Sequence, residues 1–263
     1  ATKFSQVSLD ADKRYLATLV LGVTTATGDA EGDVVERRDT AAVTRRQLAD
    51  ACALHLGAIR QVPPMHSALK HEGRALYDYA RAGIEIERTP RDVTIHAIEI
   101  VEGEGDRWTV DVRCSKGTYV RTLAEDIGRT LGCGAHLAAL RRTGSGALAL
   151  ERALTLERLA AMSEDERDAA LLPADALLAD CPVVRLDGDG AGRFLAGVRR
   201  RVPLADAAQV RVYGPEPAAF LGSAHITAGE LISNRLLSPI EVQGLVGAAS
   251  FRPSSPATQP PAP

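Results

Sequence analysis

Cysteine pairs, histidine clusters and long apolar runs are all missing from this sequence of 263 residues. The four cysteines are Cys52, Cys114, Cys133 and Cys181, and no two of them form a CxxC pair. This spacing argues against a zinc site and a disulfide framework and favours a reducing, cytoplasmic compartment. The six histidines show no metal-ligand spacing. Charged residues or glycines interrupt the apolar runs well before membrane-spanning length, so we expect no metal and no membrane partner.

Positive charge is unevenly distributed along the chain. The formal net charge of −3 argues against a wholly basic nucleic-acid binder. Residues 113–142 nevertheless contain six basic and two acidic side chains, a local net charge of +4. A solvated helix face has the same composition, so this segment is either an ordinary charged surface or a local site for an anionic partner.

The period of the hydrophobic residues predicts several strands. Residues 13–22 alternate as a half-buried strand does, and residues 91–114 form two extended runs around the turn-rich EGEGD. A second hairpin is predicted around GDAEGD, residues 28–33. Antiparallel hairpins that alternate with helices favour an α+β fold, with a mixed, mainly antiparallel sheet and flanking helices, over a doubly wound parallel fold.

Helix and loop signals lie between these strands. Thr44 is placed to cap a helix, and a further helix is predicted from about Thr118 to Gly132 because apolar residues recur there every four positions. Two prolines forbid a regular helix at the start of residues 61–69, so an irregular connection is expected there, followed by a short helix over residues 72–81. GDGAG, residues 188–192, lacks the Lys-Ser/Thr of a phosphate-binding loop and is predicted to be a turn.

Changes in composition along the chain divide it into two predicted domains and a tail. From Pro182 onward, short extended runs alternate with Gly, Pro and Asp, as in a small β-rich domain. The ending RPSSPATQPPAP holds five of the fourteen prolines and cannot build a core. We therefore predict a first domain at residues 1–180, a β-rich domain at residues 181–247 and a disordered tail at residues 248–263.

The most distinctive stretch is CSKGTYVRTLAEDIG, residues 114–128, where a strand is predicted to pass into a helix. Gly117 lets the backbone approach a partner, and amides at the start of the helix favour an anion. Lys116 adds a point charge, Arg121 adds a planar fork for carboxylate or phosphate, and Tyr119 offers a ring for a base. These parts suit an RNA site, although a strand-to-helix corner with ordinary surface charges also explains them.

Cys114 and His136 offer a different chemistry, because a cysteine thiol and a histidine base together form the nucleophile pair of thiol hydrolases. No recognisable motif orients His136 towards Cys114, so a thiol hydrolase is kept only as an alternative hypothesis.

Three segments together resemble one protein family. KFSQ-x3-D-x-DKRY, then PPMHSALKHEGRALYDYAR, and then CSKGTYVRTLAEDIG followed by LGCGAHLAALRR occur in the order found in the TruB family of tRNA pseudouridine synthases. The similarity extends from Thr2 to about Pro239. The β-rich end is similar to the small RNA-binding PUA domain of bacterial members.

The resemblance implies an isomerase that converts the uridine at position 55, in the T-loop of tRNA, to pseudouridine. It also implies that the enzyme uses no cofactor and no metal, acts as a monomer on the tRNA T-arm, and takes the target base out of the RNA fold. By position, Tyr15 matches the ring that packs on uracil, and Tyr119 and Leu140 match further pocket residues. Arg121 matches the Arg that pairs with the catalytic carboxylate. Further candidate RNA contacts are Lys70, Lys116, Arg141 and Arg142.

The sequence departs from the family pattern at the nucleophile. The family's catalytic Asp lies in a motif G-x-L-D-P-x-A-x-G, which does not occur in these 263 residues, and Asp10 in SLDADKRY lacks the flanking Pro and Gly. We therefore expect an N-terminally truncated copy whose nucleophilic Asp belongs upstream of Ala1 and whose Arg121 is without that catalytic carboxylate as its partner. The alternative is a non-catalytic protein that binds RNA or helps tRNA to fold.

Overall fold

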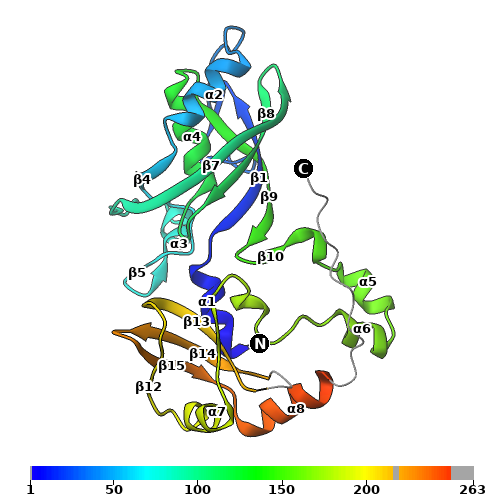
Figure 1. The fold of residues 1–263 in the computed structure, drawn as a ribbon. Helices are drawn as coiled ribbons and strands as arrows, with labels where there is room; N and C mark the ends of the chain where they lie inside the picture. Colours follow the sequence, from blue (N-terminus) through cyan, green and yellow to red (C-terminus); the bar gives the residue numbers. More distant parts are fainter. Residues whose placement is uncertain (1, 216–218, 250–263) are drawn as a thin grey trace, which may run out of the picture. The chain divides into compact units, whose positions relative to one another are not determined.

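The computed structural model describes residues 2–215 and 219–249, which form two compact units (Figure 1). The first unit is residues 8–158, and the second is made of the described residues at the two ends of the chain. Within the described ranges, no helix has the length and apolar character needed to cross a membrane.

Two predictions concern the ends of the chain. Ala1, upstream of which the nucleophilic Asp is expected, lies outside the described residues. Residues 250–263, on which most of the predicted disordered tail falls, also lie outside the described residues.

The first unit is built on a six-stranded sheet with the order β10-β9-β1-β8-β7-β4, and every neighbouring pair in it is antiparallel. Its strands are β1 (Lys13–Leu21), β4 (Gly57–Gln61), β7 (Arg91–Glu104), β8 (Arg107–Cys114), β9 (Ala135–Ser145) and β10 (Leu148–Ala149). Two small hairpins pair β2 (Val23–Thr25) with β3 (Val34–Arg37), and β5 (Lys70–His71) with β6 (Arg74–Ala75).

Helices α2 (Arg45–Ala53) and α4 (Val120–Thr130) share one hydrophobic core with the main sheet. The fully buried Leu48 of α2 and Leu123 of α4 pack there against apolar residues of β1, β8 and β9. Thr44 caps α2 as predicted, and its hydroxyl accepts a hydrogen bond from the Gln47 amide. The other helical segments of this region are α1 (Ser5–Asp10), α3 (Leu76–Arg81), η2 (Leu150–Arg152) and α5 (Leu156–Ala161).

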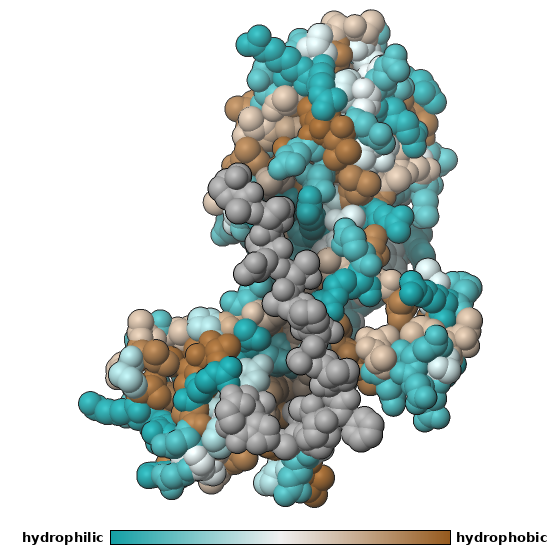
Figure 2. Space-filling model, turned by 45° about the vertical axis from the view of Figure 1, so that its right-hand side comes forward, coloured by the Kyte–Doolittle hydropathy of each residue, from teal (hydrophilic) through white to brown (hydrophobic). Residues whose placement is uncertain are grey.

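The second unit contains a five-stranded sheet with the order β11-β13-β14-β15-β12, in which only the pair β11–β13 is parallel among the described strands. Its elements are η1 (Thr2–Phe4), α6 (Glu164–Ala170), η3 (Ala176–Leu178), β11 (Val183–Arg185), α7 (Gly188–Leu195), β12 (Arg200–Arg201), β13 (Ala207–Tyr213), β14 (Phe220–Thr227), β15 (Glu230–Leu236) and α8 (Pro239–Ala249). The predicted α+β class with mainly antiparallel pairing is therefore confirmed. Hydrophilic and hydrophobic residues are intermixed on the face seen in Figure 2, as is usual for protein surfaces.

Two local predictions were wrong. GDGAG is the start of α7 rather than a turn, because Asp187 caps the helix by accepting a hydrogen bond from the Gly190 amide at 2.7 Å. The helix expected over residues 72–81 begins only at Leu76, since the β5–β6 hairpin occupies the residues before it. In both places the deciding contact is a cap or a strand pair that hydrophobic spacing does not reveal.

Candidate functional site

The turn between β8 and α4 lies within the motif of residues 114–128 and fixes where α4 begins. Gly117 has a φ of +80°, and a Cβ placed on it would meet no atom within 4 Å, so glycine is favoured there by backbone conformation and not by lack of space. The Thr118 hydroxyl donates to the Ser115 carbonyl at 3.0 Å, and the Ser115 hydroxyl accepts from the Thr94 amide at 2.9 Å. These bonds fix the turn on β7 and let α4 begin directly after Tyr119.

Arg121, in the first turn of α4, is held by two segments that are distant from it in the sequence. Its Nη1 lies 2.8 Å from Oδ2 of Asp29, in the connection between β2 and β3. Its Nη2 donates to the His66 carbonyl at 2.5 Å, in the loop before β5. About three quarters of both charged side chains is covered, with 23% and 24% exposed. Arg121 is therefore not without a carboxylate in this chain, because Asp29 pairs with it. Its pairing with the catalytic Asp expected upstream stays a prediction.

Both carboxylate oxygens of Asp29 are engaged. Oδ1 accepts from the Thr27 hydroxyl at 2.5 Å and from the Glu31 amide at 3.2 Å, while Oδ2 binds Arg121. Burial acts to raise the pKa of Asp29, but these hydrogen bonds and the Arg121 guanidinium outweigh it and lower the pKa below its ordinary value. Asp29 is thus an ionised carboxylate with both oxygens hydrogen-bonded.

Glu125 lies one helical turn after Arg121 and faces the same connection. A Cβ on Gly28, the neighbour of Asp29, would lie 3.0 Å from the Glu125 carboxyl group. Burial, together with the nearby Asp126 carboxylate, raises the pKa of Glu125. An open cavity of about 640 Å³ adjoins this region, with Thr27, His66 and Glu125 among its lining residues.

The predicted pocket residues Tyr15 and Leu140 lie on two adjacent strands, together with the candidate RNA contact Arg142. Tyr15 of β1 pairs with Arg142 of β9, and the Arg142 guanidinium lies 5.5 Å from the centre of the Tyr15 ring. Leu140 pairs with Ala17 and is 48% exposed. Tyr15 packs against the same core as Val120, the first residue of α4. The sheet thus places Tyr15 and Leu140 on neighbouring strands, and Tyr119 and Arg121 stand at the start of α4.

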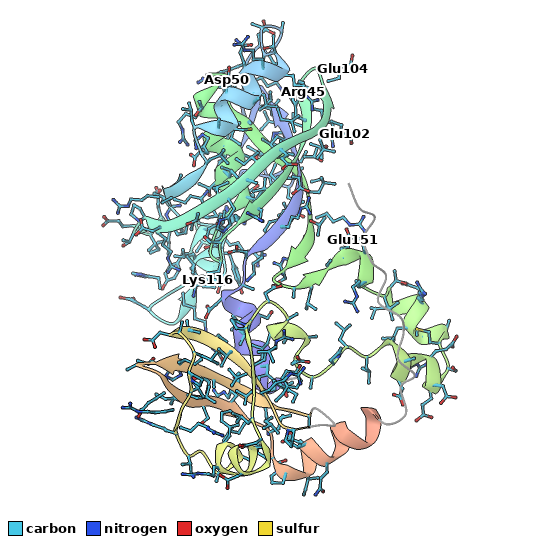
Figure 3. The ribbon with its side chains drawn as sticks, in the orientation of Figure 1. Arg45, Asp50, Glu102, Glu104, Lys116 and Glu151 are labelled. Atoms are coloured by element: carbon cyan, nitrogen blue, oxygen red, sulfur yellow. The ribbon has the colours of Figure 1, made fainter. Side chains whose placement is uncertain are left out.

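Lys116 is paired in an exposed position. Its Nζ lies 2.5 Å from Oδ1 of Asp10, and this hydrogen bond lowers the pKa of Asp10. Figure 3 shows Lys116 at the end of the first unit opposite to Glu102 and Glu104. Lys116 is thus part of the β8–α4 turn, at this end of the unit.

Basic and aromatic side chains gather on the segment from β5 to α3. The Arg74 guanidinium lies 4.7 Å from the centre of the Tyr79 ring, and His71 contacts the same ring edge-on at 5.9 Å. Arg81 lies 5.4 Å from the Tyr77 ring, and Lys70 is exposed beside them. Arg141 and Arg142 are exposed as well, on β9. These are the residue types that contact RNA backbones and unstacked bases.

Cys114 and His136 have structural roles. Cys114 is fully buried, and burial raises the pKa of its thiol. The Nδ1 atom of His136 lies 2.9 Å from the Val23 carbonyl oxygen, so its ring is hydrogen-bonded to the β2 backbone. This arrangement argues against a thiol hydrolase. Among the described residues, no group of three or more His, Cys, Asp or Glu side chains is placed to hold a metal ion.

Comparison with known proteins gives consistent matches over both units. The family model "TruB family pseudouridylate synthase (N terminal domain)" matches residues 1–120. The models "tRNA pseudouridylate synthase B C-terminal domain" and "Pseudouridine synthase II TruB, C-terminal" match residues 121–179 and 182–237.

Relatives and solved structures agree with these matches. A tRNA pseudouridine synthase B of Verminephrobacter eiseniae is 51% identical over 258 residues, which are 96% of this chain and 78% of the relative. The enzyme of the same name from Thiobacillus denitrificans is 52% identical over 245 residues, 92% of this chain and 80% of the relative. A crystal structure of a Cbf5-Nop10-Gar1 complex has a similar fold, with a TM-score of 0.69 at 21% identity over 92% of this chain and 71% of that chain.

Proposed function

Because the chain belongs to the TruB family of pseudouridine synthases, which are isomerases, we propose that it converts a uridine of tRNA, at position 55 in the T-loop, to pseudouridine. In this reaction the bond from N1 of uracil to the ribose is broken, the base is turned, and a carbon–carbon bond to the same ribose is formed, so no atom is gained or lost. The name tRNA pseudouridine synthase B, shared by the relatives, supports the substrate class.

The observation that carries this proposal is the fixed guanidinium of Arg121. Asp29 and the His66 carbonyl hold Arg121 in one orientation before any substrate binds. A preorganised cation is well suited to orient a nucleophilic carboxylate and to stabilise charge that develops on it during the reaction. We propose this role for Arg121.

Asp29 is proposed to position Arg121 rather than to attack the ribose or the base. Its Oδ1 accepts from Thr27 and Glu31 and its Oδ2 from Arg121, so both oxygens are already engaged, which disfavours nucleophilic attack by Asp29. The lowered pKa points the same way, because it reflects how tightly the carboxylate is bound. The nucleophile is proposed to come from a G-x-L-D-P-x-A-x-G motif upstream of Ala1.

Tyr15, Tyr119 and Leu140 are proposed to form the wall of the uridine pocket. Arg142 lies on one side of the Tyr15 ring, and the ring then offers its remaining surface to uracil. An exposed Leu140 on the neighbouring strand supplies apolar surface that a flipped base would cover. We further propose that neither a cofactor nor a metal takes part and that the protein acts as a cytoplasmic monomer.

RNA contacts are proposed on both units. On the first unit the candidates are Lys70, Lys116, Arg141 and Arg142, with the basic and aromatic side chains of residues 71–81 beside Lys70. The β-rich domain, residues 181–247, is proposed to be a PUA-like RNA-binding domain, and residues 1–180 the pseudouridine synthase domain. These contacts would direct the protein to the T-arm.

The test uses a T-arm stem-loop RNA and two measurements. Fluorescence anisotropy measures binding over a series of salt concentrations, and carbodiimide labelling with primer extension detects pseudouridine. Lys70→Ala is expected to reduce the slope of log affinity against log salt by about 1, whereas Arg37→Ala, at an exposed position of β3, is not. Both assays are run with the 263-residue chain and with a form extended by the nucleophile motif.

The two forms separate the candidate functions. Pseudouridine made by the extended form supports the proposal. Salt-sensitive binding without pseudouridine in either form supports the alternative, a non-catalytic protein that binds RNA or helps tRNA to fold. Pseudouridine made by the 263-residue chain itself contradicts the proposed source of the nucleophile and returns Asp29 to consideration.

A further inference from the structure

Gln61 is deeply buried at the end of β4. Just 2% of it is exposed, whereas the other four residues of the strand are exposed or half-buried. A buried primary amide is costly unless its polar atoms are hydrogen-bonded, so the partners of Gln61 indicate what it does.

Both polar ends of the Gln61 side chain contact the backbone of one residue, Tyr119. The Tyr119 amide donates to Oε1 at 3.0 Å, and Nε2 donates to the Tyr119 carbonyl at 3.4 Å. The carbonyl also accepts from the Leu123 amide at 3.0 Å, within α4, whereas the Tyr119 amide precedes the helix. Oε1 of Gln61 therefore supplies the acceptor for that amide.

This arrangement resembles one of the two hydrogen bonds of a capping box, with a glutamine that comes from a strand and not from the helix itself. At α2, Gln47 accepts a hydrogen bond from the amide of the capping residue Thr44 at 2.9 Å. At α4 the corresponding position is Thr122, whose side chain is shorter, and Tyr119 has no side-chain cap of its own. Gln61 makes the same bond to the Tyr119 amide from a position 58 residues away.

A second bond joins the same loop to α4. Five residues after Gln61, the His66 carbonyl accepts the hydrogen bond from Arg121. The segment from Gln61 to His66 therefore binds α4 on both sides of Val120, through the Tyr119 backbone and the Arg121 side chain. Pro63 and Pro64 lie between the two attachment points and restrict the backbone of the connection.

We propose that Gln61 is a positioning residue for the isomerisation of uridine. It fixes the backbone of Tyr119, and through the first turn of α4 it fixes the direction in which Arg121 presents its guanidinium. This inference rests on the proposed function of Tyr119 and Arg121. The competing explanation is that Gln61 contributes only to stability, as any satisfied buried amide does.

Two substitutions at Gln61 separate the effect of side-chain length from the effect of the polar group at its end. Gln61→Asn keeps the amide but is one methylene shorter, so it removes the bond to the Tyr119 amide. Gln61→Glu keeps both the reach and the acceptor, and a buried carboxylic acid can stay neutral and still donate to the Tyr119 carbonyl. Leu48→Ala serves as the matched control, because Leu48 is fully buried in α2 and its loss destabilises the same core without touching Tyr119.

The first measurement is amide hydrogen exchange on the 263-residue chain. Exchange at Tyr119 is expected to become at least about tenfold faster in Gln61→Asn, and to stay within about threefold of the parent in Gln61→Glu and Leu48→Ala. If Gln61→Asn leaves Tyr119 as protected as in the parent, Gln61 does not fix this backbone and the proposal is overturned.

The second measurement is turnover by the form extended with the nucleophile motif. Gln61→Asn is expected to lower kcat by about 10- to 100-fold while RNA affinity changes by less than about threefold, and Gln61→Glu is expected to restore most of the loss. An equal loss of kcat in Leu48→Ala, measured below its unfolding temperature, would show a merely structural role and overturn the proposal. If the parent makes no pseudouridine, the proposed function fails, and the exchange result still decides whether Gln61 fixes Tyr119.

Discussion

At the scale of single residues, the proposed site is built on an ion pair between two residues 92 positions apart in the sequence, Arg121 and Asp29. Arg121 was predictable because it stands in a dense motif with Lys116, Gly117 and Tyr119. Asp29 was not, because it lies in GDAEGD, where turn formation alone accounts for an aspartate. Nothing in the local pattern of residues 28–33 indicates that this carboxylate reaches α4.

Replacing Asp29 tests whether the pair positions the guanidinium. Asp29→Asn leaves the Arg121 charge partly covered without its counter-ion, which is expected to cost about 1 to 3 kcal/mol of unfolding free energy. In the extended form, kcat is expected to fall by about 10- to 100-fold with little change in RNA affinity. Asp33→Asn is the control, since Asp33 is exposed in the same connection. Unchanged kcat in Asp29→Asn would show that the His66 and Thr27 carbonyls suffice to hold Arg121.

Replacing Tyr15 tests whether its ring packs on the base. Tyr15→Phe keeps the aromatic face and is expected to retain most of the turnover, because stacking needs the ring and not the hydroxyl. Tyr15→Leu removes the ring and is expected to cost about 1 to 3 kcal/mol of binding to the flipped base. Steady-state turnover of both variants decides the matter, and equal activity of Phe and Leu would rule out stacking.

At the scale of elements, periodicity and caps predicted the first unit well. The strand at residues 13–21, the hairpin of β7 and β8, and α4 all follow from hydrophobic spacing, and Thr44 caps α2 as its position indicated. The β5–β6 hairpin and the capped start of α7 escaped prediction, since each depends on a few specific hydrogen bonds. The role of Gln61 escaped for the same reason: its partner is a backbone amide on another element.

Two glycines allow the β8–α4 turn to be tested with a matched control. Gly117 (φ +80°) and Gly105 (φ +61°) both have a left-handed backbone and free space where a Cβ would lie. Alanine at either position is expected to lower the unfolding free energy by about 1 kcal/mol, through backbone strain alone. Only Gly117→Ala is expected to reduce turnover as well, because that turn aims Tyr119 and Arg121. Chemical denaturation and single-turnover assays measure the two effects, and equal turnover in both variants would contradict this assignment.

At the scale of the whole molecule, folding stability should depend on pH, and two partly buried carboxylates near Arg121 contribute with opposite pKa shifts. Asp29 has a lowered pKa, so its contribution is present above its ordinary value of 3.8 and is lost as the pH falls through the lowered one. Glu125 has a raised pKa, so its contribution is present below its ordinary value of 4.5 and is lost as the pH rises through the raised one.

Glu125→Gln isolates the second contribution. At pH 7 the variant is expected to be more stable than the parent, by up to about 1 kcal/mol, because it no longer buries a charge. The difference should shrink towards zero as the pH falls below 4.5, where Glu125 itself is neutral. Urea unfolding between pH 4 and 7 measures this, with Glu104→Gln as a control that removes a charge from an exposed position. A stability difference that does not vary with pH would show that Glu125 is not desolvated as described.

The most direct test of the account is the separation of binding from chemistry at Arg121. In the form that carries the nucleophile motif, Arg121→Ala is expected to lower kcat for pseudouridine formation in a T-arm stem-loop by at least about 100-fold. RNA affinity is expected to stay within about threefold, because the guanidinium faces a carboxylate and not the RNA backbone. A variant that loses RNA binding and keeps kcat at saturating RNA would contradict the role of Arg121 as the fixed cation of a uridine isomerase.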